Sequence, residues 1–216
     1  MSKPRIAVVG IGGMGSYHTN LVNCGGLFDL VAIVEPVTAA RHVATQTFSV
    51  RGVGDISEII DAIDCAIIAT PTRYHFEVAK TLLKAGKHVL IEKPITFEIA
   101  QANELIALAE SNKLVLQVGH VERFNPAFSA VAKHVSAPMF IEAVRTSNYS
   151  FRSTDIGVTL DLMIHDIDLV LSLVDSPIAA IDAVGSIVIG PHEDIANARL
   201  TFKNGAFANL TASRVN

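Results

Sequence analysis

The chain has 216 residues, half of them hydrophobic, which is enough to bury one large core or two modest ones. Its formal net charge of -4 and its scattered lysines and arginines provide no basic stripe for nucleic acid and no polybasic run for a membrane surface. No apolar run approaches the roughly 18 residues of a membrane span, and the start MSKPRIAVVG differs from a signal peptide. We therefore predict a globular cytoplasmic protein that binds neither nucleic acid nor membrane.

The first half of the sequence alternates short apolar runs with stretches of helical periodicity. Helical spacing is clearest over residues 76–85 and 97–111. The apolar runs have the length and composition of buried strands: residues 6–9, 30–34, 65–69, 89–91 and 114–118. Strands and helices that alternate in this way predict a doubly wound parallel α/β sheet, the Rossmann type of fold.

The character of the sequence changes near residue 121. The predicted elements are then a short helix, a strand, a long helix and three further strands: residues 126–134, 139–146, 161–173, 181–189, 196–202 and 207–212. This order predicts an α+β domain, in which one or two helices cover a mostly antiparallel open sheet. We therefore predict two domains, residues 1–121 and 122–216.

The segment GIGGMG follows the first predicted strand and opens the first helix. Gly10, Gly12 and Gly15 have G-x-G-x-x-G spacing. The first permits a tight turn, the second lets a pyrophosphate approach the backbone, and the third lets the helix pack closely. An ordinary tight turn is the alternative. We predict a dinucleotide site in the first domain, with contacts from the whole loop: Gly10, Ile11, Gly12, Gly13, Met14 and Gly15.

Glu35 bears on which dinucleotide binds. It ends the second predicted strand, about 20 residues after the last glycine, where an acid binds the adenosine ribose. A carboxylate there repels a ribose phosphate, so NAD is the predicted cofactor and NADP the alternative. Arg41 lies close enough in sequence to compensate for that repulsion.

The segments ATPTRYH and IEKPIT also end predicted strands, at the edge where such sheets bind ligands. We predict that five of their residues line the cofactor site: Thr70, Pro71, His75, Glu92 and Lys93. Lys93 should point toward the cofactor. The alternative is a surface lysine paired with Glu92, since structural ion pairs also occur at such edges.

The helix DLMIHDIDLVLSL combines an apolar circumference with charged side chains. At helical spacing, Asp161, His165, Asp168 and Ser172 form one narrow polar stripe. Charge on a buried helix is costly unless it is paired or faces a wet cavity, so the stripe needs a partner from elsewhere in the chain. Asp166 and Asp168 are interpreted as structural residues.

Neither a zinc site nor a disulfide is predicted. Cys24 and Cys65 lie far apart in the sequence and belong to no CxxC pair. We expect two free thiols in the core and no metal ion.

A resemblance to a known family rests on five segments: GIGGMG, ATPTRYH, EKP, VGHVERFNPAF and DLMIHDID. In this order they resemble the Gfo/Idh/MocA family of NAD(P)-dependent sugar oxidoreductases, and they span most of the chain. The resemblance implies that Lys93 is the family's EKP lysine, and that Asp161 and His165 are its D-x-x-x-H pair. The first domain would then bind NAD and residues 122–216 the substrate, with the polar stripe facing the nicotinamide and Lys93 across a domain cleft.

The chemistry of that family assigns a role to each of these groups. Oxidising a secondary alcohol requires removal of the hydroxyl proton as hydride leaves the adjacent carbon, so a group that titrates near neutral pH should reach the oxygen. His165 is the candidate base, Lys93 could stabilise the developing alkoxide, and Asp161 could orient the ring or the substrate. Whether Lys93 or His165 takes the proton stays open. The alternatives for the pair are a core histidine capped by an acid, or a metal site.

Within the family, VGHVERFNPAF and DIGVTLDLMIHDIDLVLSL are most similar to bacterial UDP-N-acetylglucosamine 3-dehydrogenases. Those enzymes make a 3-keto sugar nucleotide for amination in lipid A or surface-polysaccharide synthesis. A nucleotide sugar carries a diphosphate, which favours guanidinium and amide donors. The predicted substrate contacts are Arg123, Asn125, Tyr149 and Arg152. The alternative for both arginines is solvation or pairing with nearby acids.

Two other functions remain open. One is a non-catalytic dinucleotide-binding regulator, against which the presence of Lys93, Asp161 and His165 argues. The other is a different enzyme, such as an inositol or free-sugar dehydrogenase or a small-carbonyl reductase. Family members usually continue well beyond this length and complete a broad sheet that often forms the oligomer interface. We therefore expect either a truncated chain or a naturally shortened member, and a homo-oligomer if the second domain is complete.

Overall fold

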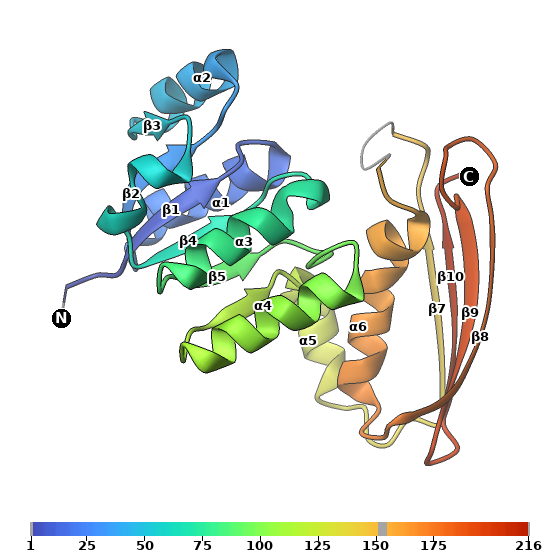
Figure 1. Ribbon diagram of the computed structural model, residues 1–216. Coiled ribbons are helices and arrows are strands. Elements are labelled where there is room, and N and C mark those ends of the chain that lie inside the picture. Colours follow the sequence, from blue (N-terminus) through green and yellow to red (C-terminus); the bar gives the residue numbers. More distant parts are fainter. Residues whose placement is uncertain (1, 151–154, 216) are drawn as a thin grey trace. The chain divides into compact units, whose positions relative to one another are not determined.

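The computed structural model describes residues 2–150 and 155–215. The chain divides into two compact units, residues 1–119 and 120–216. Each unit has its own sheet and its own apolar core (Figure 1). In the described part of the chain, no helix combines the length and the apolar character that crossing a bilayer requires.

The N-terminal unit contains the predicted parallel sheet. Its strands lie in the order β3-β2-β1-β4-β5-β6, and each pair of neighbours is parallel. In chain order they are β1 (Arg5–Val9), β2 (Asp29–Val34), β3 (Gly52–Val53), β4 (Cys65–Ile68), β5 (His88–Ile91) and β6 (Leu116–Val118). The strand order reverses between β1 and β4, which is where doubly wound sheets bind ligands.

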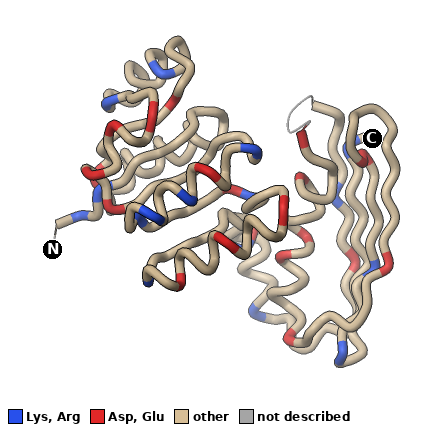
Figure 2. The backbone as a smooth tube through the Cα atoms, viewed as in Figure 1, with Lys and Arg blue, Asp and Glu red and all other residues tan. Residues whose placement is uncertain are grey.

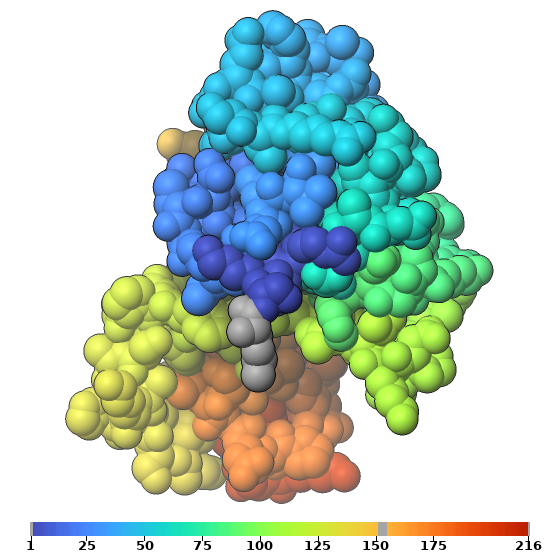
Figure 3. Space-filling model, turned by 90° about the vertical axis from the view of Figure 1, so that its left-hand side faces the viewer, coloured from blue at the N-terminus to red at the C-terminus, as the bar shows by residue number. Residues whose placement is uncertain are grey.

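Helices cover both faces of this sheet: α1 (Gly13–Gly25), α2 (Thr38–Phe48), α3 (His75–Lys84) and α4 (Ile99–Ser111). Successive side chains of a strand point to opposite faces, and in β1 both faces are buried. Val9 belongs to one core cluster with Leu82 of α3, whereas Val8 packs with Val22 of α1 on the other side. Helix α2 stands at the surface, at the top of Figure 3, with only Ala44 buried.

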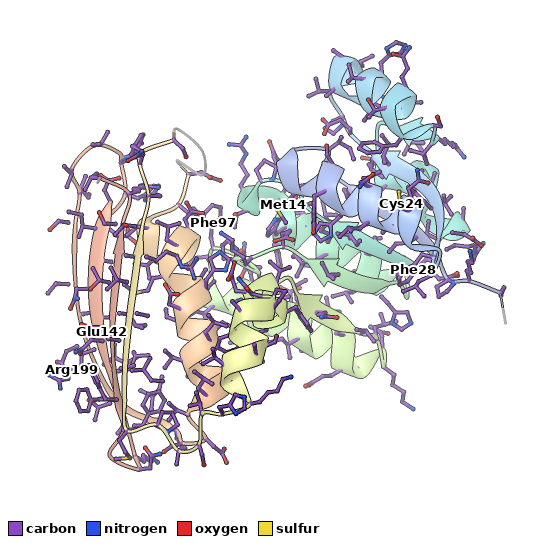
Figure 4. All side chains as sticks on the ribbon, turned by 180° about the vertical axis from the view of Figure 1, so that it is seen from behind. Met14, Cys24, Phe28, Phe97, Glu142 and Arg199 are labelled. Carbon is purple, nitrogen blue, oxygen red and sulfur yellow. The ribbon has the colours of Figure 1, made fainter. Side chains whose placement is uncertain are left out.

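The C-terminal unit has the predicted mostly antiparallel sheet, in the order β7-β10-β9-β8. Strands β7 and β10 are parallel, and the other two pairs are antiparallel. The elements are α5 (Pro126–Ala132), β7 (Phe140–Thr146), α6 (Ile164–Leu173), β8 (Ile178–Ser186), β9 (Ile195–Phe202) and β10 (Phe207–Ser213). The core lies between α6 and the sheet, where Val170 packs with Phe202 and Leu210. Glu142 and Arg199 are exposed and project from the opposite face of the sheet (Figure 4).

Short turns of 3₁₀ helix interrupt the loops: Ile56–Glu58, Ile60–Ala62, Thr72–Tyr74 and Val121–Phe124.

Two predicted elements differ from the structure. The helix expected over 161–173 begins with a π-helical turn, Thr159–Met163, before α6 continues. A π turn closes over five residues, so side chains before and after it do not follow one 3.6-residue period. The strand expected over 181–189 is Ile178–Ser186, because the residues after it form a turn held by the Asp194 carboxylate.

The cysteines are free thiols, but they do not lie in the core as expected. Cys24 is exposed and Cys65 is only partly buried. Cys24 belongs to the last turn of α1, beyond the residues with which that helix packs on the sheet. Among the residues that the structure describes, no group of three or more His, Cys, Asp or Glu side chains is placed to hold a metal ion.

Candidate active site

The glycine-rich loop joins β1 to α1 at the point where the strand order reverses. Gly10 has a φ of +88°, a conformation that other residues rarely adopt, and a Cβ there would meet the backbone nitrogen of Thr70 at 2.8 Å. A Cβ at Gly15 would collide with the carbonyl oxygen of Gly10. The fold itself therefore requires both of these glycines.

Gly12 and Gly13 stand in open space instead. A Cβ at either position would meet no atom of the described residues within 4 Å. Gly12 is the N-cap of α1, Gly13 begins the helix, and Met14 is exposed in its first turn (Figure 4). Accessible backbone N–H groups at a helix N-terminus are what a phosphate requires. Packing within the described residues therefore does not require a glycine at position 12. An anion that approaches this backbone would require one, because a side chain would block it.

A pocket of about 660 Å³ lies between this loop and the ends of β2 and β4. Six of the predicted cofactor residues line it: Gly10, Ile11, Gly12, Glu35, Thr70 and Pro71. The others are not part of this lining: Gly13, Met14, Gly15, His75, Glu92 and Lys93. Arg73 and Tyr74 also line the pocket and were not predicted, although their place within ATPTRYH was a usable signal. The Arg73 guanidinium lies 5.0 Å from the centre of the Tyr74 ring.

Glu35 follows β2 directly and lies against the glycine-rich loop. One carboxylate oxygen accepts a hydrogen bond from the backbone N–H of Ile11 at 3.2 Å, and the other accepts one from Val37 at 3.0 Å. Nη1 of Arg41 donates to the backbone carbonyls of Glu35 and Pro36 at 2.6 and 3.2 Å. Nη2 of Arg41 also donates to the Thr38 hydroxyl at 3.3 Å, so the guanidinium is held beside Glu35.

One polar group of the pocket is not satisfied by the protein. The hydroxyl oxygen of Thr70 is buried and has no hydrogen-bond partner among the described residues. A buried hydroxyl without a partner is costly, so a ligand atom that bonded to it would be stabilising. These three groups fit a dinucleotide: the open backbone at Gly12 suits a pyrophosphate, the Glu35 carboxylate suits ribose hydroxyls, and the Thr70 hydroxyl offers a further hydrogen bond.

The EKP segment follows β5, with a cis peptide bond between Lys93 and Pro94. The side chain of Glu92 is buried, and one of its carboxylate oxygens lies 2.7 Å from Nε2 of His18, which is also buried. The other oxygen accepts a hydrogen bond from the backbone N–H of Lys93 at 3.3 Å. Lys93 itself is partly exposed. The Glu92 carboxylate is therefore directed toward α1.

His75 is only 1% exposed, and both of its ring nitrogens face backbone carbonyls. Nδ1 lies 2.9 Å from the carbonyl oxygen of Pro94, and Nε2 lies 2.8 Å from that of Thr70. His75 thus joins the loops that follow β4 and β5. Its role as a direct contact of the cofactor stays a prediction.

The D-x-x-x-H pair lies where the π-helical turn passes into α6. Asp161 belongs to the turn and His165 to the first turn of α6, and both side chains are partly exposed. The backbone N–H of Asp161 bonds to the carbonyl of Gly157 at 3.0 Å. Asp161 thus lies in the π-helical turn and His165 in the α-helix that follows it.

The other two acids of this helix are buried and paired with arginines. Nη2 of Arg145, on β7, lies 2.8 Å from a carboxylate oxygen of Asp166. Arg123 donates from Nε and Nη2 to the two oxygens of Asp168, each at 2.6 Å. His120, which was not predicted, has its Nδ1 4.0 Å from the same carboxylate. Figure 2 shows in red where acidic residues occur along the backbone. Arginines from outside the helix thus supply the partners that the sequence of the helix requires.

Two of the remaining predicted substrate residues, Asn125 and Tyr149, have partners of their own. The side chain of Asn125 caps α5 by accepting a hydrogen bond from the backbone at 3.0 Å. The ring of Tyr149 lies 5.4 Å from the guanidinium carbon of Arg214. Arg152 lies outside the described residues. The glycine-rich loop and Lys93 belong to the N-terminal unit, and Asp161, His165 and Arg123 belong to the C-terminal unit, so their meeting at one cleft stays a prediction.

Two sequence profiles of known families match the chain. The one described as "Oxidoreductase family, NAD-binding Rossmann fold", of Gfo/Idh/MocA proteins, matches residues 4–120. The one described as "GFO/IDH/MocA C-terminal domain" matches residues 128–216.

Named relatives include two dehydrogenases. UDP-N-acetylglucosamine 3-dehydrogenase of Acidithiobacillus ferrooxidans is 37% identical over 98% of this chain, which covers 67% of that protein. The NAD-dependent scyllo-inositol 2-dehydrogenase of Bacillus subtilis is 27% identical over 97% of this chain, which again covers 67% of the relative. Among solved structures, UDP-N-acetylglucosamine 3-dehydrogenase GnnA from Acidithiobacillus ferrooxidans matches with a TM-score of 0.92 and 34% identity, over all of this chain and 71% of that one.

Proposed function

The chain belongs to the Gfo/Idh/MocA family of NAD-binding oxidoreductases, and on that premise we propose that it oxidises the 3-hydroxyl group of UDP-N-acetylglucosamine with NAD. One observation carries the choice of substrate: the 37% identity to UDP-N-acetylglucosamine 3-dehydrogenase over nearly the whole chain. The product is a 3-keto sugar nucleotide, which is suited to amination in lipid A or surface-polysaccharide synthesis.

The cofactor part of the proposal rests on the pocket of the N-terminal unit. Glu35 accepts hydrogen bonds from the ribose hydroxyls, and the backbone at Gly12 receives the pyrophosphate. A carboxylate at position 35 repels a ribose phosphate, so the proposed cofactor is NAD and not NADP. Glu35→Ala should weaken NAD binding and narrow the difference from NADP. Titrations with both dinucleotides test this, and unchanged affinities for the two would remove the assignment.

The chemical step is assigned to three side chains. When bound, NAD supplies an acceptor for the hydride that leaves the carbinol carbon. His165 takes the hydroxyl proton, so that the C–H and O–H bonds break and a carbon–oxygen double bond forms. Lys93 donates a hydrogen bond to the same oxygen and stabilises its negative charge, and Asp161 orients His165 or the sugar. The reverse assignment, with Lys93 as the base, uses the same groups.

The diphosphate of the substrate is assigned to the C-terminal unit. A guanidinium carries five N–H groups, and Asp168 accepts hydrogen bonds from two of those on Arg123. Asp168 thereby fixes the plane of the guanidinium, and we assign the diphosphate to its remaining edge. Asn125, Tyr149 and Arg152 complete the proposed substrate contacts.

A second candidate function is oxidation of an inositol or another free sugar. The observation that favours it is the 27% identity to scyllo-inositol 2-dehydrogenase over 97% of the chain. Such a substrate has no diphosphate, so it carries no anionic group for Arg123 to bind.

The test is NADH formation with UDP-N-acetylglucosamine, free N-acetylglucosamine and scyllo-inositol as alternative donors. The proposal expects turnover with the nucleotide sugar, and a loss of about 100-fold or more in Lys93→Ala and His165→Ala with NAD binding retained. Turnover with inositol alone would favour the second candidate. NAD binding without NADH formation from any donor would indicate a regulator.

The proposed contact between Arg123 and the diphosphate is tested with two variants, Arg123→Ala and Asp168→Asn. UDP-N-acetylglucosamine with NAD should protect the wild type against heat far better than free N-acetylglucosamine does, and Arg123→Ala should erase that difference. Asp168→Asn keeps the arginine and changes only its partner, so it should retain a part of the protection. Equal protection by the free sugar, or none by either, would refute the assignment of the diphosphate.

A further inference from the structure

Both neighbours of Lys93 in the chain are held by buried histidines of the N-terminal unit. On one side, the Glu92 carboxylate lies 2.7 Å from Nε2 of His18, a residue of α1. On the other side, the carbonyl oxygen of Pro94 lies 2.9 Å from Nδ1 of His75, the first residue of α3. The two histidines are 8% and 1% exposed. Rings that are packed on all sides can hold the atoms they contact in one place.

The Glu92 carboxylate is confined from three directions. Oε1 faces His18, and Oε2 accepts a hydrogen bond from the backbone N–H of Lys93 at 3.3 Å. Gly119, directly after β6, lies so close that a Cβ there would come within 3.0 Å of Oε1. A buried carboxylate needs hydrogen-bond partners, and His18 is a side chain that supplies one. The position of the Lys93 backbone is therefore coupled to α1, the helix that follows the glycine-rich loop.

His75 couples the same segment to the other side of the pocket. Its Nε2 lies 2.8 Å from the carbonyl oxygen of Thr70, whose hydroxyl is the unsatisfied group of the dinucleotide pocket. A neutral imidazole donates to one of the two carbonyls, and a protonated one donates to both. In either state the ring fixes the spacing between the loops after β4 and β5.

We propose that His18 and His75 are positioning residues that clamp the EKP segment from both sides and so hold the Lys93 ammonium group where it can reach the reacting oxygen. The clamp also joins Lys93 to the two loops that form the dinucleotide pocket. This inference rests on the proposed role of Lys93. A misplacement of about 1 Å can cost a catalytic group about 100-fold in rate, so a clamp of this kind has a measurable effect.

The test compares an apolar and a polar replacement at each histidine. His18→Leu removes the partner of Glu92, whereas the amide of His18→Gln can still donate a hydrogen bond from a similar place. His75→Leu and His75→Gln form the matching pair. Turnover, NAD affinity and melting temperature are measured for each variant. In parallel, a short pulse of acetic anhydride labels the lysines, and mass spectrometry compares Lys93 with the exposed Lys113 in the same unit.

The clamp predicts a specific combination of results. Both Leu variants should lose about tenfold or more in kcat, and their labelling at Lys93 relative to Lys113 should change. His18→Leu should keep an NAD affinity near that of the wild type, whereas His75→Leu should also lower it, because His75 contacts Thr70 in the lining of the dinucleotide pocket. The Gln variants should return both quantities toward the wild type. Folded Leu variants with unchanged labelling overturn the proposal, whether or not their NAD affinity or melting temperature falls.

A third variant covers the case in which the Leu variants do not fold. Gly119→Ala removes no polar group, but its methyl presses on the Glu92 carboxylate, so it should change kcat and Lys93 labelling together. Unchanged labelling in Gly119→Ala overturns the clamp at Glu92. If the wild type forms no NADH from any donor, the proposed function fails, while the labelling of Lys93 still decides whether the histidines position it.

Discussion

Substituting Gly12 with alanine separates ligand binding from folding at the glycine-rich loop. The substitution adds one methyl group at a place where no atom of the described residues lies within 4 Å. The backbone there has φ -72° and ψ -165°, which alanine adopts without strain. Gly15→Ala, three residues later, would instead drive a methyl group into the carbonyl of Gly10. The two variants should therefore fail in different ways.

The expected effect of Gly12→Ala on stability is small. Alanine is a poorer N-cap than glycine by about 0.5–1 kcal/mol. It also restricts the unfolded chain, which stabilises the fold by about 0.4–1 kcal/mol. These terms oppose each other, so the free energy of unfolding should change by less than about 1 kcal/mol, and the melting temperature by less than about 4 °C. If a pyrophosphate approaches this backbone, the methyl group blocks it, and NAD affinity should fall at least tenfold, or about 1.4 kcal/mol.

The assay is NAD titration by calorimetry beside thermal unfolding of the same samples. Gly25→Ala is the matched control, because it lies at the other end of α1 and its Cβ also meets nothing within 4 Å in the part of the chain that the structure describes. It should bind NAD like the wild type. Gly15→Ala should lose both stability and binding. Wild-type NAD affinity in Gly12→Ala would refute the placement of the pyrophosphate at this loop.

Two further predictions concern charged pairs. Arg145→Met leaves the buried Asp166 carboxylate without its partner and should lower the free energy of unfolding, measured in urea, by about 3 kcal/mol. Adding Asp166→Asn should restore most of that stability, and equal stability of the single and double variants would contradict the prediction. The Arg5 guanidinium lowers the pKa of the Asp64 carboxyl from 3.8 to about 2. In Arg5→Gln, the Asp64 pKa measured by carbon-13 NMR should therefore rise toward 3.8. Because folding lowers this pKa, the pair stabilises the fold above pH 3.8, and the effect is lost as the pH falls toward 2.

The parallel sheet could be predicted because its strands are buried on both faces. The run IAVV of β1 is buried at each position, so it reads as a continuous apolar stretch between helical segments. β3 was missed because its two residues, Gly52–Val53, are too few to show a period. The glycine spacing and Glu35 were recognisable because both are local consequences of one strand–turn–helix unit. Pairings between distant residues are different in kind: nothing local in the sequence connects His18 with Glu92, 74 residues away.

The polar residues of the long helix show where a single helical period misleads. The stripe expected from Asp161 to Ser172 assumes 3.6 residues per turn throughout, but residues 159–163 form a π turn. A sequence does not mark such a turn clearly. A π turn changes which backbone groups hydrogen-bond to each other, but it does not change which side chains are apolar.

The structure divides the polar residues of this helix by the partners they have. Asp166 and Asp168, on the regular part, are each paired with an arginine from another element of the C-terminal unit, and these pairs fix α6 to β7 and to the turn that contains Arg123. Asp161 and His165 lie at the junction with the π turn, a feature that is frequent at functional sites. The buried ion pairs thus fix the orientation of the helix, and the proposed catalytic pair lies where the π turn passes into it. This division accounts for a charged helix in an apolar core: two acids serve the packing of the unit, and the other two groups are the ones that we assign to the chemistry.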